Sequence, residues 1–183
     1  MIQNIIAMDM MASPARMIES PALDYQTLAP LLIMFGGACV ALLLDAFVRR
    51  PARAVVQLVS VFVVLIATMG MLIANWVDGH FSVVANGLLA MDKPTYVAQG
   101  ALIVFTALSM ILFSTRHARR LKTIPESERT EHSEIYVLAL FSLFGMMLFT
   151  AATNLLMLFV ALEVMSLPLY VLSGLALYRR RLS

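Results

Sequence analysis

Five long apolar segments constrain the fold of this chain more than any other feature. They run near residues 29–48, 55–76, 96–114, 135–151 and 154–178, and none contains Lys or Arg. A helix needs about 20 apolar residues to cross the roughly 30 Å of bilayer hydrocarbon. With 61% hydrophobic and 13% charged residues, the chain has too few polar side chains to cover five buried helices in water. We therefore expect an all-α, polytopic integral membrane bundle of about five transmembrane helices.

The basic residues predict the orientation of these helices. Eleven of the 13 Lys and Arg residues fall after the first, third and fifth segments, which five alternating spans place on one side. The positive-inside rule makes this side cytoplasmic, with the N-terminus outside and the C-terminus inside. Residues 1–27 then form an extracytoplasmic segment, and it lacks the basic n-region of a signal peptide because its first basic residue is Arg16.

Several functional classes find no support in the sequence. A single cysteine, Cys39, excludes a disulfide framework and a cysteine metal cluster, and a net charge of +2 gives no basic field for nucleic acid. The histidines His80, His117 and His132 are far apart, in expected loops, without metal-ligand spacing. Five methionines among the first 17 residues are interpreted as apolar filler, with copper handling as the alternative. We expect no cofactor and no metal in this chain.

Other features have structural interpretations. Asp45 precedes Arg49 by four residues, which predicts an ion pair at the membrane interface. The charged segment 115–134 is interpreted as a solvated connector, with a docking surface for a cytosolic partner as the alternative. Small residues are expected to mark close helix packing: they are Gly36, Gly37, Ala38, Gly70, Gly100, Gly145 and Gly174.

One acidic residue, Glu163, lies near the middle of the fifth segment. A carboxylate at that depth costs about 2.5–3.5 kcal/mol even on insertion scales, and such residues usually face a bundle interior and serve ion or proton paths. Unpaired, it should stay protonated, since hydrocarbon disfavours the charged form. Its partner must be a group on a helix outside this sequence, or water. The alternative is a protonated Glu163 that only hydrogen-bonds a neighbouring helix.

Two residues near Glu163 support a functional interpretation. Pro168 removes a backbone hydrogen bond to Val164 and should kink the fifth helix beside the carboxylate. Ser166 is one turn from Glu163, and can bond the carboxylate or cover the freed carbonyl.

The segment from Glu134 to Leu177 closely resembles a known family. GMM at 145–147, ALE at 161–163 and SLPLY at 166–170 are together similar to the fourth and fifth helices of subunit N of bacterial NADH:quinone oxidoreductase, complex I. The basic ending at 179–181 is similar to actinobacterial members. LLLDAF at 42–47 and Asp92 extend a looser resemblance, so that residues 28–183 match the N-terminal helices of an antiporter-like transmembrane domain and stop after helix five.

This resemblance implies a proton-translocating subunit in the bacterial plasma membrane. The family glutamate matched by Glu163 pairs with a lysine on a later helix, which would lie in the remainder of the subunit. NADH, FMN, iron–sulfur clusters and quinone bind elsewhere in the complex, so the expected partners are the other complex I membrane subunits and the lipid bilayer. A multi-subunit cation/proton antiporter and a non-transporting assembly fragment are the alternative functions.

Overall fold

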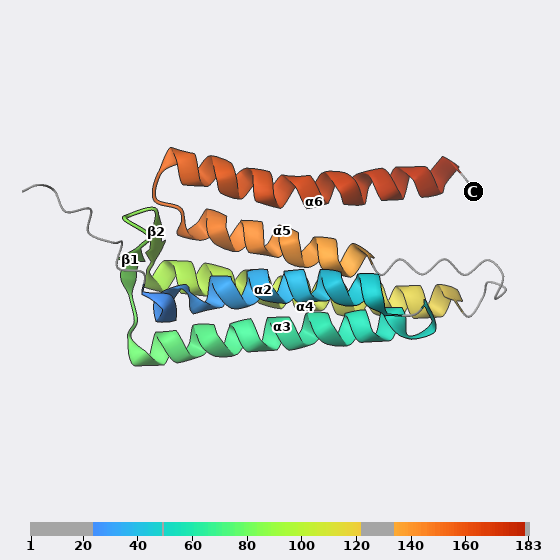
Figure 1. Cartoon of the computed structure of the whole chain (residues 1–183), viewed down its shortest axis with the longest axis horizontal. Coiled ribbons are helices and arrows are strands. Elements are labelled where there is room, and N and C mark those ends of the chain that lie inside the picture. Colours follow the sequence, from blue (N-terminus) through green and yellow to red (C-terminus); the bar gives the residue numbers. More distant parts are fainter. Residues whose placement is uncertain (1–23, 49, 122–133, 182–183) are drawn as a thin grey trace, which may run out of the picture.

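A computed structural model of the chain describes residues 24–48, 50–121 and 134–181, and Figure 1 shows their arrangement. The elements follow in the order α2 (Tyr25–Phe47), α3 (Arg50–Asp78), β1 (Ser82–Val84), β2 (Leu89–Met91), α4 (Lys93–Leu121), α5 (Glu134–Ala151) and α6 (Leu155–Arg181). The described part of the chain contains five helices that are long and apolar enough to cross a membrane. The expected all-α, multi-pass membrane fold is thus confirmed.

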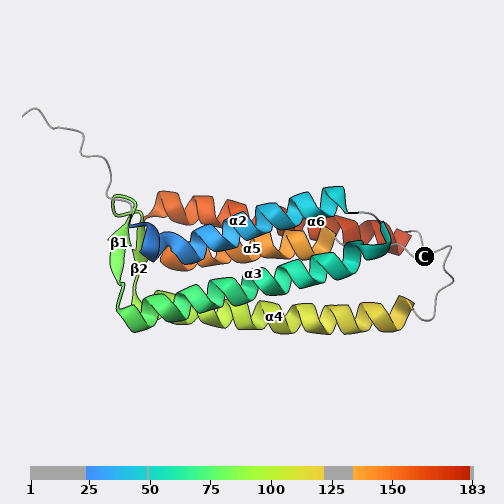
Figure 2. The same ribbon diagram turned by 60° about the horizontal axis from the view of Figure 1, so that its bottom comes forward.

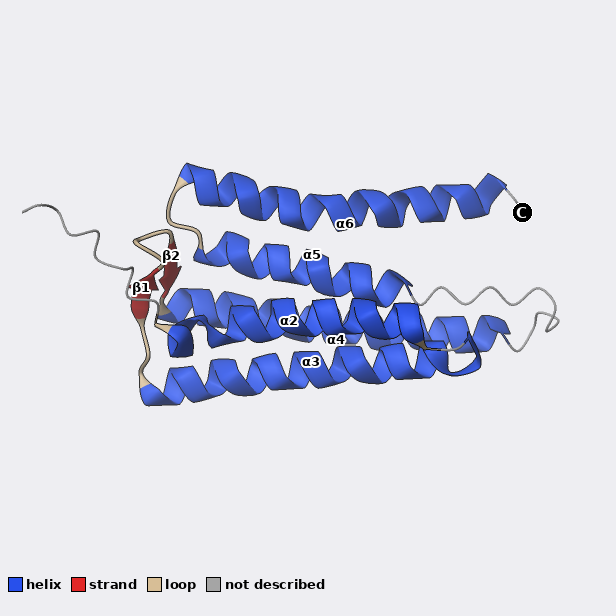
Figure 3. Cartoon of the chain, in the orientation of Figure 1, coloured by secondary structure: helices blue, strands red, loops and turns tan. Residues whose placement is uncertain are grey.

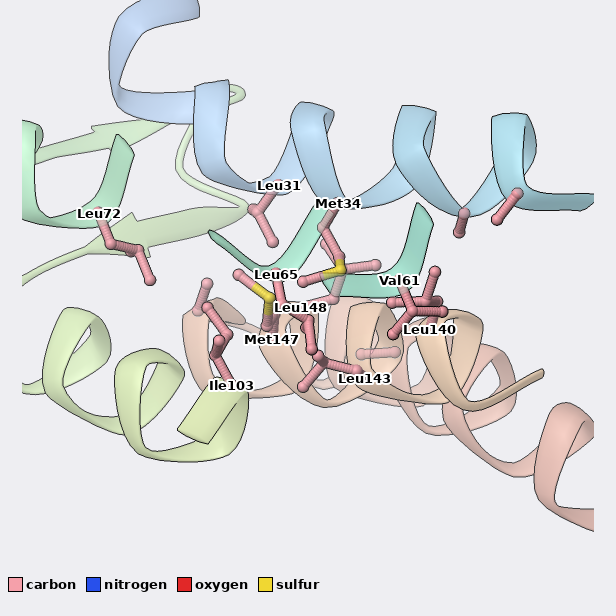
Figure 4. Packing of buried hydrophobic residues seen from close by; sticks show 14 of the residues in the cluster. Leu31, Met34, Val61, Leu65, Leu72, Ile103, Leu140, Leu143, Met147 and Leu148 are labelled. Carbon is pink, nitrogen blue, oxygen red and sulfur yellow. The ribbon is translucent and has the colours of Figure 1, made fainter. Parts of the chain in front are cut away.

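The five helices lie side by side with roughly parallel axes (Figures 1 and 2). Helix α5 occupies the centre and contacts α2, α3, α4 and α6, whereas α6 packs at the edge, mainly against α5. Half of the α5 span is buried, but only 11% of the α6 span is. Figure 4 shows the core, in which side chains from α2, α3, α4 and α5 interlock: Leu31, Met34, Val61, Leu65, Leu72, Ile103, Leu140, Leu143, Met147 and Leu148.

Two helices extend well beyond the apolar segments that predicted them. Helix α3 begins at Arg50, and α4 continues to Leu121. His117 was expected in a loop but belongs to this last part of α4, because the residues from Thr115 to Leu121 include no Gly or Pro that would end the helix. His132 and residues 122–133 of the expected connector lie outside the described residues.

A β-hairpin replaces the loop expected over residues 77–95, as Figure 3 shows. Strands β1 and β2 pair antiparallel, with Val84 opposite Leu89. The connecting turn has positive φ at Ala85 (55°), Asn86 (55°) and Gly87 (84°). Asn and Gly adopt this left-handed region at low cost, so the Asn-Gly pair favours the tight reversal between the strands.

Candidate functional site

The helix that carries Glu163 begins at a capped turn. The side-chain oxygen Oδ1 of Asn154 accepts a hydrogen bond from the backbone N–H of Met157 at 2.8 Å, which satisfies one of the free amides at the start of α6. The preceding residue, Thr153, donates its backbone N–H to Leu88 O at 3.1 Å and its hydroxyl to Gly87 O. The hairpin therefore fixes the end of the bundle from which α6 starts.

Glu163 lies near the middle of the membrane-spanning part of α6, on the side turned away from α5. It is the ninth of the 20 residues in the span Leu155–Gly174, about 12 Å along the helix from its start. Ala161 is fully buried and Met165 contacts α5, and each is two residues from Glu163, or about 200° around the helix. Exposed apolar side chains flank the half-buried glutamate, among them Leu167 and Tyr170.

No side chain among the described residues donates a hydrogen bond or pairs its charge with the Glu163 carboxylate. The described helices instead provide donors for other polar groups inside the bundle. The helical position of Glu163, about 200° from Ala161 and Met165, places this residue on the side of α6 that these five helices leave uncovered.

Ser166 and Pro168 both lie within two turns of Glu163. The Ser166 hydroxyl donates to the main-chain carbonyl of Glu163 at 3.3 Å, and neither to its carboxylate nor to Val164 O. Pro168 is buried, and α6 continues through it as one helix to Arg181. Among the described side chains none donates to the carbonyl of Val164, the residue whose helical partner Pro168 removes.

Pro30 in α2 also leaves a backbone carbonyl without its helical donor, and here a neighbouring helix supplies one. Pro30 removes the helical donor for Gln26 O, and the Nδ2 group of Asn75 in α3 donates to this carbonyl at 2.9 Å. Asn75 is fully buried. This pairing was not predicted, although the sequence shows both an amide side chain and a proline within neighbouring apolar segments.

Asp45 pairs with Arg53, a partner that the sequence did not predict. The Arg53 guanidinium donates from Nε to Oδ1 at 2.9 Å and from a terminal nitrogen to Oδ2 at 2.6 Å. The expected spacing assumed one continuous helix, but α2 ends at Phe47 and the chain turns back into α3. Arg53 then faces Asp45 across the α2–α3 contact, while Arg49 lies outside the described residues.

The expected role of the small residues holds for some of them only. A Cβ on Gly37 would lie 2.5 Å from Val64 side-chain atoms, and one on Gly145 would lie 2.4 Å from the Met165 nitrogen, whereas Ala38 is fully buried. The other four glycines have no atom within 4 Å of such a Cβ: they are Gly36, Gly70, Gly100 and Gly174. Sequence alone does not reveal which glycines face a neighbouring helix.

Comparisons with known proteins identify relatives of this chain. No protein-family profile matches it. NADH-quinone oxidoreductase subunit N from Nocardioides sp. is 40% identical over 189 residues, covering 89% of this chain and 35% of the relative. The same subunit from Parafrankia sp. is 37% identical over 192 residues (92% and 35%), and that from Cutibacterium acnes is 36% identical over 182 residues (91% and 34%).

These matches confirm the resemblance that the motifs of α5 and α6 indicated. The relatives are bacterial membrane proteins, which agrees with five apolar helices in the described residues and with a multi-pass location in the membrane. The chain spans about a third of the length of the relatives it matches. Over nine tenths of its own length, this chain is a relative of NADH-quinone oxidoreductase subunit N.

Proposed function

We propose that this chain is the N-terminal part of a proton-translocating membrane subunit of NADH:quinone oxidoreductase, in which Glu163 is a proton-path acid. The observation that carries the proposal is the position of Glu163, near the middle of the membrane span Leu155–Gly174, on the uncovered side of α6 and without a donor among the described residues. The names of the relatives supply the enzyme: each is an NADH-quinone oxidoreductase subunit N.

The chemistry of this position suits proton transfer. A carboxyl group inside the membrane can exchange a proton only with a cation or water that approaches it. A lysine on a helix in the remainder of the subunit would supply that cation, and its movement toward or away from Glu163 would move the proton. Electron transfer from NADH to quinone would take place in other subunits, so this chain would take part in catalysis through coupling alone.

Glu163→Gln tests the proposal in native membrane vesicles. The amide keeps the size of the side chain and removes the ionisable group, so we expect fewer protons pumped per NADH oxidised. NADH oxidation with a soluble electron acceptor should remain unchanged. The matched control is Glu134→Gln, which changes an exposed carboxylate at the start of α5 and should pump normally.

The alternatives predict different outcomes. Pumping at the wild-type ratio in Glu163→Gln, with normal subunit content, would refute the proton-path role and favour a non-transporting assembly element. Sodium-dependent transport that is lost in Glu163→Gln without any effect on NADH-driven pumping would favour a cation/proton antiporter.

A further inference from the structure

The attachment of α6 to the other described helices is narrow. Helix α6 packs mainly against α5, and a groove of about 400 Å³ separates it from α4. Side chains of three helices line this groove, including Phe105, Ser109, Met146 and Leu169. The position of Glu163 relative to the bundle is therefore set by the α5–α6 contact along most of the helix.

Gly145 allows the two helices to approach closely at the level of Glu163. A Cβ at this position would lie 2.4 Å from the backbone nitrogen of Met165 and 2.7 Å from its Cα. Both are backbone atoms of a helix, so no side-chain rotation can relieve such an overlap. Met165 is two residues from Glu163, and a displacement of α6 at Met165 would also displace the carboxylate.

Ser142 contacts the same residue from one turn earlier in α5. Its hydroxyl donates to Met165 O at 3.3 Å, and only 3% of Ser142 is exposed. Residues three apart lie on the same side of a helix. Gly145 thus faces the backbone nitrogen of Met165, and its lack of a side chain sets the separation of the two helices. Ser142 faces the backbone oxygen of Met165, and its hydrogen bond fixes the rotation and depth of α6.

We infer that Ser142 and Gly145 are positioning residues for Glu163, which hold α6 at the depth and rotation that the proton step requires. This inference rests on the proposed role of Glu163 in proton translocation. Neither residue touches the carboxylate, so each acts through the backbone of Met165.

The test measures both pumping and the chemical reactivity of Glu163 in native membranes. The variants are Gly145→Ala, Ser142→Ala and the conservative Ser142→Thr, which keeps the hydroxyl. Gly174→Ala is the matched control, because it adds the same methyl group to α6 where no atom lies within 4 Å. Dicyclohexylcarbodiimide, an apolar reagent that modifies protonated carboxyl groups, reports on Glu163 by mass spectrometry without requiring turnover.

We expect Gly145→Ala and Ser142→Ala to lower the protons pumped per NADH at least twofold and to change the carbodiimide rate at Glu163 at least threefold. Ser142→Thr and Gly174→Ala should match the wild type in both. If Gly145→Ala reduces the amount of subunit in the membrane, Ser142→Ala carries the test alone, since it removes only a hydroxyl group.

Two further outcomes separate the inference from the proposed function. A changed carbodiimide rate with normal pumping would support the positioning of Glu163 by α5 and refute its role in proton translocation. An unchanged rate in Ser142→Ala and in a stably inserted Gly145→Ala would overturn the positioning inference, whatever pumping shows.

Discussion

The ion pair between Asp45 and Arg53 allows a quantitative test of the α2–α3 contact. Two parallel hydrogen bonds of 2.9 and 2.6 Å join the side chains, and 7% of the Asp45 side chain and 27% of the Arg53 side chain are exposed. Arg53→Met keeps most of the aliphatic length and removes both donors. Asp45 would then be a nearly buried carboxylate without its partner.

The expected magnitude lies between two limits. Breaking a fully buried ion pair costs about 3–5 kcal/mol, whereas an exposed pair contributes roughly 0.2–1 kcal/mol. Because Arg53 is partly exposed, we expect Arg53→Met to lower the free energy of unfolding by about 2 kcal/mol. For a chain of this size, that corresponds to a decrease of about 4–8 °C in Tm. Asp45→Asn should cost about 1 kcal/mol, since its amide oxygen can still accept one hydrogen bond.

The single cysteine of the chain supplies the assay. Cys39 is half-buried in α2, the helix that also carries Asp45. A fluorogenic maleimide that reacts with Cys39 on heating in detergent micelles reports unfolding without an added label. Asp78→Asn is the control, because Asp78 is exposed at the other end of α3, and its Tm should equal that of the wild type.

A double-mutant cycle decides whether the two residues act as a pair. The combined variant should cost at least about 1 kcal/mol less than the sum of the single changes, because each single change already breaks the same interaction. A coupling energy below about 0.3 kcal/mol would refute the reasoning, as would an Arg53→Met variant as stable as the wild type.

Three more predictions concern helix packing, helix capping and orientation in the membrane. Gly37→Ala should destabilise by about 1–3 kcal/mol, since Val64 is stiff and lies 2.5 Å from the added carbon, whereas Gly36→Ala should be neutral in the same melting assay. Asp24 caps the start of α2, where its carboxylate accepts hydrogen bonds from the backbone N–H groups of Gln26 and Thr27. The hydrogen bond from the Thr27 hydroxyl lowers the pKa of Asp24, so the stability that this cap contributes is present above about pH 4 and is lost as the pH falls through the lowered pKa. Asp24→Asn should flatten that acid-side decrease in Tm between pH 5 and pH 3, and an equal decrease would contradict the role of the cap. The orientation can be tested with single cysteines in a Cys39→Ala background. Asn86→Cys in the hairpin turn should react with an impermeant maleimide from outside intact cells, and Thr123→Cys should react only after permeabilisation. The opposite pattern would contradict the predicted orientation.

The number of spans could be predicted from the sequence because the length and apolarity of a segment alone decide whether it can cross a bilayer. The rotation of a helix such as α2 about its own axis could not. Helix α2 is apolar on nearly all sides, so no polar side marks which of its residues face a neighbour, whereas in α3 the buried residues Gln57, Thr68 and Asn75 mark that side. Gly37 and Gly36 are adjacent in the sequence, yet only Gly37 faces a neighbouring helix closely.

The missed features depend on contacts between elements that are distant along the chain. The hairpin had a local signal in Asn86-Gly87 between apolar residues, which is a strong indicator of a tight turn. Its contact with Thr153 joins residues 65 or more positions apart and has no local signal. Arg53 is only eight residues from Asp45, but its partner depends on where α2 ends rather than on helical spacing.

The contrast between Asn75 and Glu163 explains why the described helices are not sufficient for proton chemistry. Asn75, Gln57 and Gln99 each donate a side-chain amide to a carbonyl of a neighbouring helix, so polar groups facing the bundle serve its packing. Glu163 lies deeper in its span than these three residues, but it is on the side of α6 away from this bundle and has no such donor among the described residues. Lipid cannot supply a donor or a cation. If Glu163 exchanges protons as proposed, its proton partner must reach the free side of α6, either as water or as a cation from another helix.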